Sequence, residues 1–156
     1  MTISGVTTFL WFDKEAEEAA NLYVSLFPES RMGNTSYYPE GSLLPAGTVL
    51  TVEFEIFNQP FSCLNGGPMF THSEAVSFQV ACDTQEEIDY LWNSLIADGG
   101  EEGQCGWCKD KFGVSWQIIP KALPQALSSS NPEISSYAMQ AMMQMSKIII
   151  TDLTKH

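Results

Sequence analysis

The segment FLWFDKEAEEAANLYVSLFPES (residues 9–30) joins a strand pattern to a helix pattern. The run from Ile3 to Phe12 is rich in β-branched and aromatic residues, which favour a strand. Asp13 is a good helix N-cap, and Pro28 closes the pattern that follows. Between them, five apolar residues recur at helical spacing and form one face: Ala16, Ala19, Ala20, Tyr23 and Phe27. The segment therefore predicts a strand followed by a helix over residues 14–27.

A pair of strands is predicted next, after a loop rich in Gly, Pro and Ser. Residues 48–57 alternate between an apolar face with Leu50, Val52, Phe54 and Ile56 and a second face with Thr51, Glu53, Glu55 and Phe57. A turn at residues 58–59 then returns the chain through residues 61–64 to the loop Asn65-Gly66-Gly67-Pro68.

The second half of the sequence repeats this order. Residues 75–81 predict a strand, and Thr84 with Glu87 forms a capping box for a helix over residues 85–97. Strands are expected at residues 104–108 and 114–119. The order strand, helix, strands thus occurs twice at a period of roughly 70 residues, which is typical of a duplicated module. The second helix presents one apolar face: Ile88, Leu91, Trp92, Leu95 and Ile96.

A Met-rich helix is expected near the C-terminus, where Asn131 and Pro132 form a start signal. Its apolar face would cover the sheet or a partner subunit, and it comprises Ile134, Ala138, Ala141, Met142 and Met145.

Composition limits the classes of partner. With 156 residues, 44% of them apolar, the chain has the size of one domain with a real core. Seven basic and nineteen acidic residues give a net charge of -12, which disfavours nucleic acid and anionic membranes. The sequence shows neither a signal-peptide pattern nor an apolar run of membrane-spanning length. We therefore expect a cytoplasmic protein.

Several motifs together resemble one family. The segment 9–30, LNGGP, AVSFQV, QCGW, KDKFGVSWQIIP and the closing AMQAMMQM with KI are similar to the PhnB-like branch of the vicinal oxygen chelate (glyoxalase-like) superfamily. The resemblance implies an α+β fold in which two βαβββ modules form an incomplete barrel around a central cleft, with an extra C-terminal helix. It also implies a homodimer. We expect a single domain, residues 1–156, with module one at about 1–72, module two at about 73–120 and a helical extension at 121–156.

Proteins of this branch often carry the label demethylubiquinone methyltransferase. A methyltransferase of the common nucleotide-binding fold would need a Gly-rich turn between a strand and a helix, and GxGxxG is absent from the sequence. The motifs therefore do not support a methyltransferase activity.

Metal-dependent members of the superfamily hold a divalent ion with His and Glu side chains. The positions that resemble those ligands carry Thr7 or Thr8, Ala75 and Gln117, none of which is a good ligand. His72 and Glu74 fall short of a metal site, and the other histidine is the terminal residue. We expect no metal and no cofactor.

Two carboxylates are weak candidates for catalysis. Glu53 and Glu55 share the face opposite the apolar one, so they point either to solvent or into a cavity. In a cavity, their like charges would raise one pKa and supply a general base without a metal.

The QCGW motif (residues 104–107) overlaps a segment with the CxxC spacing of redox dithiols, Cys105 to Cys108. Such dithiols start a helix, whereas this segment has a strand pattern, which disfavours a redox pair or half of a zinc site. The resemblance of QCGW to a family motif implies instead that Cys105 and Trp107 form part of a cavity wall, with a lone reactive thiol as the alternative. The same strand logic adds further lining residues that suit a flat or partly apolar organic ligand. The predicted ligand-binding set is Phe9, Trp11, Asn65, Gln79, Cys105, Trp107 and Gln117.

Three functions fit these patterns, and whether the protein is an enzyme stays open. The first is binding of a small organic molecule without a catalytic metal. The second is a metal-dependent lyase, isomerase or dioxygenase that uses Glu53 or Glu55. The third is a structural dimer in which the C-terminal helix plugs the cavity.

Overall fold

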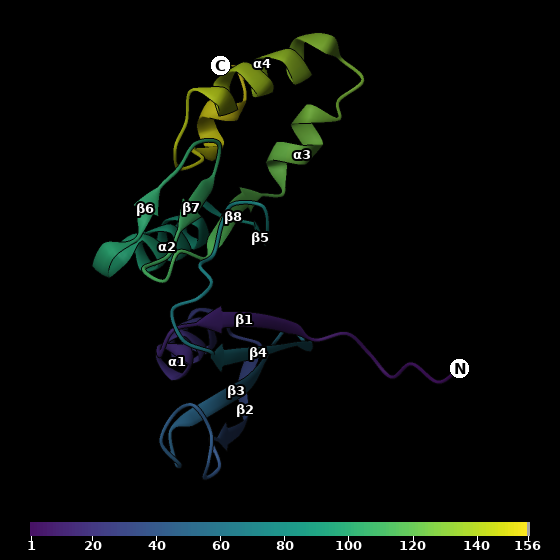
Figure 1. Cartoon of the computed structure of the whole chain (residues 1–156). Coiled ribbons are helices and arrows are strands. Elements are labelled where there is room, and N and C mark those ends of the chain that lie inside the picture. The colour runs from purple at the N-terminus through teal and green to yellow at the C-terminus, as the bar shows by residue number, and fades with distance from the viewer. Residues whose placement is uncertain (156) are drawn as a thin grey trace. The chain divides into compact units, whose positions relative to one another are not determined.

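The computed structural model describes residues 1–155 and shows two units, each built on one four-stranded sheet (Figure 1). Unit 1 comprises Met1–Thr71, and unit 2 comprises the described residues from His72 onward. The class is α+β, as the sequence predicts.

Unit 1 contains one helix and one mixed sheet. Its elements are β1 (Thr8–Phe12), α1 (Ala16–Leu26), β2 (Ser30–Tyr37), β3 (Val49–Ile56) and β4 (Gln59–Asn65). The strand order is β1-β4-β3-β2. Strand β1 pairs with β4 in parallel, and the other pairs are antiparallel.

Unit 2 has the same topology. Its elements are β5 (Ser77–Cys82), α2 (Gln85–Ile96), the short 3-10 turn η1 (Ala97–Gly99), β6 (Glu101–Glu102), β7 (Trp107–Lys109) and β8 (Ser115–Pro120). The order is β5-β8-β7-β6, with β5 parallel to β8. The repeated βαβββ order is therefore confirmed.

The same backbone hydrogen bond occurs inside each unit, and it shows which residues of the two units are equivalent. The amide of Gly66, which follows β4, donates to the carbonyl of Phe12 at 2.9 Å. The amide of Lys121, which follows β8, donates to the carbonyl of Cys82 at the same distance. Phe12 and Cys82 are thus equivalent positions, and the pairing registers extend this equivalence across both sheets.

Each helix covers one face of its sheet and leaves the other face open. In unit 1 the predicted apolar face of β3 is confirmed, since Val52, Phe54 and Ile56 are buried. Helix α1 packs on this face. The capping box of Thr84 and Glu87 is present at α2, and four of its five predicted apolar residues are buried: Ile88, Leu91, Trp92 and Leu95.

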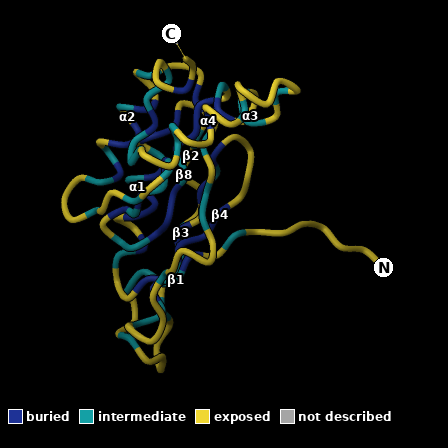
Figure 2. Tube along the Cα trace, turned by 90° about the horizontal axis from the view of Figure 1, so that it is seen from above, coloured by how far each residue is buried: buried dark blue, intermediate teal, exposed yellow. Residues whose placement is uncertain are grey.

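Several predicted boundaries were wrong. Strand β1 begins at Thr8 rather than Ile3, and residues 1–7 form an exposed tail (Figure 2). Strand β2 was predicted as a loop because its sequence, SRMGNTSY, is polar. It pairs with β3 with register shifts at two places. Asp13 does not cap α1. Cys105 and Gly106 lie in a turn with positive φ, which breaks the strand predicted over residues 104–108.

The C-terminal segment adds a small apolar cluster to unit 2. Helices α3 (Ala122–Leu127) and α4 (Pro132–Met143) pack against each other and against the 3-10 turn η2 (Ile150–Leu153). Asn131 caps α4, as predicted. Helix α3 was not predicted. The buried centre of the cluster consists of Ile119, Leu123, Ile148 and Leu153, flanked by Leu127, Met142 and Met145.

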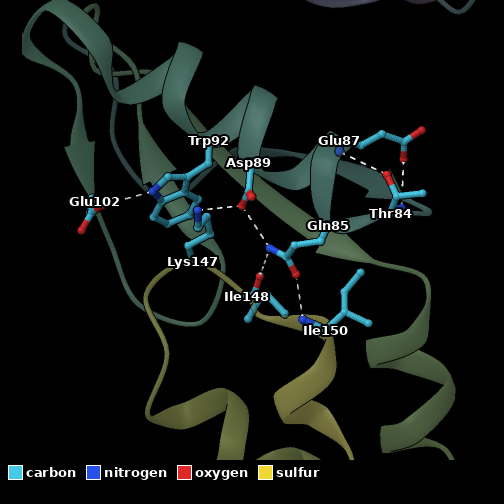
Figure 3. A network of polar contacts seen from close by, with 9 residues as sticks. All are labelled: Thr84, Gln85, Glu87, Asp89, Trp92, Glu102, Lys147, Ile148 and Ile150. Carbon is cyan, nitrogen blue, oxygen red and sulfur yellow. Dashed lines mark hydrogen bonds and ion pairs between the residues drawn. The ribbon is translucent and has the colours of Figure 1, made fainter.

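Polar contacts tie this segment to α2 (Figure 3). Gln85 Nε2 donates to the backbone carbonyl of Ile148 at 3.1 Å, and Gln85 Oε1 accepts from the backbone N–H of Ile150 at 2.9 Å. The Gln85 side chain therefore holds two backbone groups of the segment. In addition, Lys147 Nζ lies 2.6 Å from Asp89 Oδ1.

None of the described helices is long and apolar enough to cross a membrane.

Candidate functional site

The open face of unit 1 carries a row of side chains across three strands. The registers place Phe9 opposite Ser62 and Ser62 opposite Glu53. Because side chains alternate along a strand, all three point away from the α1 side, where Leu10, Cys63 and Phe54 are buried. The predicted residues Phe9 and Glu53 thus lie on one surface.

A pocket of about 620 Å³ lies over this row. Phe9 is 60% exposed and forms part of its apolar lining. Arg31 and Glu55 also line it. Arg31 Nη2 lies 2.7 Å from Glu55 Oε2, and its Nε donates to the same oxygen at 2.8 Å. Glu53 and Glu55 therefore both border a solvent-open pocket, and Glu55 is paired with Arg31.

Ser62 stands out in this pocket because its hydroxyl is buried. The residue is only 2% exposed, and Oγ has no hydrogen-bond partner within residues 1–155. Buried polar groups in native proteins are nearly always bonded, so an exception requires an explanation. A ligand that supplies the missing hydrogen bond is one explanation that the pocket makes possible.

Trp11 and Asn65 form contacts within unit 1. The Trp11 indole N–H donates to the carbonyl of Gly67 at 2.8 Å, and its ring meets Phe70 edge-on. Asn65 Oδ1 accepts from the amide of Ala16 at 2.8 Å, and its amide nitrogen donates to the carbonyl of Val49. Asn65 is thus the side chain that caps α1, the role expected for Asp13.

The equivalent row in unit 2 contains three predicted residues. Gln79 pairs with Gln117, and Gln117 pairs with Trp107, so they occupy the positions of Phe9, Ser62 and Glu53. Here the polar groups bond to one another. Gln79 Nε2 donates to Gln117 Oε1 at 3.2 Å, and Gln117 Nε2 donates to Ser77 Oγ at 2.8 Å.

The two cysteines of the CxxC spacing have different surroundings. Cys105 is half-buried in a turn, where its amide donates to the carbonyl of Met145. Cys108 is buried, and burial, followed by the charges of Asp110 and Glu102, raises the pKa of its thiol to about 12. A thiolate at Cys108 is therefore disfavoured, which argues against a redox dithiol.

The donor set of these faces does not suit a divalent metal. Among the residues that the structure describes, no group of three or more His, Cys, Asp or Glu side chains is placed so that it could hold a metal ion. In unit 1, the carboxylate of Glu55 is engaged by Arg31, and the neighbours of Glu53 in its row are a serine and a phenylalanine. Three or more such ligands are typical of a protein metal site.

Two residues of the unit 1 pocket, Ser62 and Arg31, were not predicted from the sequence. The alternation of side chains along β4 predicts the face on which Ser62 lies, but nothing in the sequence indicates that its hydroxyl lacks a partner. Arg31 lies in β2, which was predicted as a loop.

The sequence profile of the family described as 3-demethylubiquinone-9 3-methyltransferase matches residues 4–119. The chain belongs to this family. The resemblance to the PhnB-like branch is therefore confirmed over both sheets, and the profile match ends before the C-terminal helices.

Solved structures agree with this assignment to the PhnB-like family. A PhnB protein of Bacillus cereus is 37% identical over 75% of this chain and 99% of its own, with a TM-score of 0.68. A protein of Pseudomonas aeruginosa (17% identity, 76% and 98% coverage, TM-score 0.60) and a gene product of Arabidopsis thaliana (16%, 74% and 97%, 0.51) share the fold. None of the curated proteins matches the chain.

Proposed function

We propose that this PhnB-like protein binds a small, flat organic molecule on the open face of unit 1, without a catalytic metal. The observation that carries the proposal is the hydroxyl of Ser62, which lies buried beneath a pocket of about 620 Å³ and has no hydrogen-bond partner among the described residues. The pocket volume lies within the range of roughly 300–1,000 Å³ that small-molecule sites usually have.

The neighbouring side chains define the chemistry of the ligand. The exposed ring of Phe9 offers a surface on which a flat ring stacks. Glu53 accepts a hydrogen bond from a ligand donor, and Ser62 Oγ donates to or accepts from a ligand polar atom. Because Arg31 neutralises Glu55, Glu53 leaves the pocket with one net negative charge, which disfavours anions. An uncharged ring compound with at least one hydrogen-bond donor fits best.

A thermal-shift screen of uncharged aromatic fragments tests the proposal. A hit should raise the unfolding midpoint of the wild-type protein because it binds only the folded state. Ser62→Ala should weaken that binding about fivefold, the equivalent of one ordinary hydrogen bond of about 1 kcal/mol. Phe9→Ala should weaken it further.

Two matched controls accompany these variants. Ser42→Ala removes an exposed serine hydroxyl of unit 1 outside the pocket, and Tyr37→Ala removes an exposed aromatic ring outside the pocket. Both should bind the hit as the wild type does. The proposal is wrong if no fragment binds, if Ser62→Ala and Phe9→Ala retain full affinity, or if protein purified without chelator holds a stoichiometric metal ion that Glu53→Gln removes.

A further inference from the structure

Unit 2 contains a second pocket, and several of its lining residues are acidic. It has a volume of about 390 Å³ and lies beside the β6–β7 hairpin. Its lining includes Glu74, Glu101, Glu102, Trp107, Lys109 and Ser115. Only Trp107 belongs to the predicted ligand-binding set, and the family assignment gives the other five no role.

The charges of this pocket favour a cation. Three carboxylates and one ammonium group line it, which gives a net charge of -2. Lys109 Nζ lies 2.5 Å from Glu74 Oε1 and 4.0 Å from Glu101 Oε2. The hydrogen bond between them lowers the pKa of Glu74 and raises that of Lys109, so both stay charged at neutral pH. The only cation of the lining is therefore already paired, and an anionic ligand would meet uncompensated carboxylates.

A buried hydroxyl in the lining provides an independent indication of a ligand. Ser115 pairs with Lys109 across β7 and β8 and lies on the same open face. It is 1% exposed, and Oγ has no hydrogen-bond partner in the described part of the chain. A buried polar group without a partner is costly, and a ligand donor would remove that cost.

Trp107 adds an aromatic surface to the same face. It lies two residues before Lys109 on β7, so both side chains point to the open side. An indole ring attracts an organic ammonium group through its negative face, and Trp is the strongest aromatic partner for a cation. Carboxylates, a hydroxyl and an indole together match the needs of a protonated amine.

We infer that this pocket binds an organic ligand through a protonated primary amine. The ligand ammonium takes the place of Lys109 Nζ beside Glu74 and Glu101, donates to Ser115 Oγ and rests against Trp107. In the empty pocket, the Lys109 ammonium occupies this position. The inference concerns unit 2 and does not depend on the function proposed for unit 1.

Three probes of nearly equal size and different charge test the inference: phenethylamine, 2-phenylethanol and 3-phenylpropionate. Titrations of the full-length protein are followed by NMR, with the amide signals of Lys109 and Ser115 and the Trp107 indole signal as reporters. We expect phenethylamine to bind, the alcohol to bind several-fold more weakly, and the carboxylate to leave these signals unchanged.

Substitution of Lys109 tests the inference through the direction in which the affinity for phenethylamine changes. Lys109→Gln removes the competing ammonium, so the affinity for phenethylamine should rise about two- to fivefold, the range expected for an exposed ion pair. Glu101→Gln and Ser115→Ala should lower it. Glu86→Gln, a charge-matched change in the first turn of α2, should leave it unaltered.

The opposite pattern would overturn the inference. If the pocket instead recognised anions through Lys109, 3-phenylpropionate would bind and Lys109→Gln would abolish its binding. If none of the three probes shifted the reporter signals of the folded wild-type protein, the pocket would not be a site for this class of ligand.

Discussion

The sheets of the two units have the same strand order, but the side chains on their open faces form different hydrogen bonds. At equivalent positions, unit 1 carries Phe9, Ser62 and Glu53, whereas unit 2 carries Gln79, Gln117 and Trp107. The glutamines of unit 2 bond to each other and to Ser77. Ser62 has no such partner within the described chain. A duplicated fold thus sets where a row of side chains lies, while the side chains decide which of its polar groups are already bonded within the sheet and which are left for a ligand.

The largest loss of stability should come from a change in the C-terminal segment, which is part of unit 2. Ile148 is fully buried in the cluster with Ile119, Leu123 and Leu153. We expect Ile148→Ala to lower the free energy of unfolding by about 2–5 kcal/mol, as for other buried Ile or Leu truncations. Hydrogen exchange should show faster opening of α2 and β8 amides.

The control for this change is Ile134→Ala on α4, where the side chain is 45% exposed and the loss should be much smaller. Equal effects of the two substitutions would show that the buried cluster does not hold the segment in place.

The close contact between Gly66 and the Trp11 ring in unit 1 should give the next largest effect on stability. A Cβ at Gly66 would lie 2.4–2.5 Å from three atoms of the Trp11 ring, whereas the equivalent position in unit 2 is Lys121. Gly66→Ala should therefore displace the ring and cost about 1–3 kcal/mol. The Trp11 indole N–H signal should shift as its bond to Gly67 weakens. Gly5→Ala, which meets no atom within 4 Å, should be neutral.

Helices α1 and α2 are capped differently, and the difference predicts unequal losses of stability when each cap is removed. Asn65 caps α1 from a distant strand and is buried, while Thr84 caps α2 locally through the exposed capping box. Asn65→Ala should cost about 1–2 kcal/mol because it leaves the buried amide of Ala16 and the part-buried carbonyl of Val49 without this partner, and Thr84→Ala about 1 kcal/mol or less. Urea unfolding of both variants gives the comparison, and a larger loss for Thr84→Ala would contradict it.

Lowering the pH should weaken the contact between α2 and residues 147–150 of unit 2, and this effect on stability should be the smallest of the series. Hydrogen bonds from Lys147 and then Gln85 lower the pKa of Asp89 below its ordinary value of 3.8. A lowered pKa stabilises the folded state above the ordinary value, and this contribution is lost as the pH falls through the folded value. Exchange at residues 147–150, corrected for intrinsic rates, should therefore accelerate below about pH 4. Asp89→Asn should show this faster exchange already at neutral pH.

Local patterns predicted most of the fold. Helical spacing located α1 and α2, strict alternation located β3, and the capping box at Thr84 and Glu87 was exact in position. Strand β2 was missed because its residues are polar and it is stabilised by pairing with β3 rather than by its own pattern.

The candidate site was only partly predictable. Alternation placed Glu53 and Phe9 on one face, because strand geometry fixes the side on which a residue lies. It could not reveal that Asn65 reaches back to cap α1, a contact between residues 49 positions apart. Nor could it distinguish Ser62, which is buried and lacks a hydrogen-bond partner in the described part of the chain, from Gln117, which has one, since that depends on neighbouring strands.

The most direct test of the central claim is an NMR titration of the wild-type protein with an uncharged aromatic fragment that stabilises it. We expect the amide signals of Phe9, Ser62 and Glu53 to shift with a common affinity, while those of Gln79 and Gln117 stay unchanged. Shifts confined to Gln79 and Gln117, with the Ser62 row unaffected, would contradict the assignment of unit 1 as the ligand-binding face.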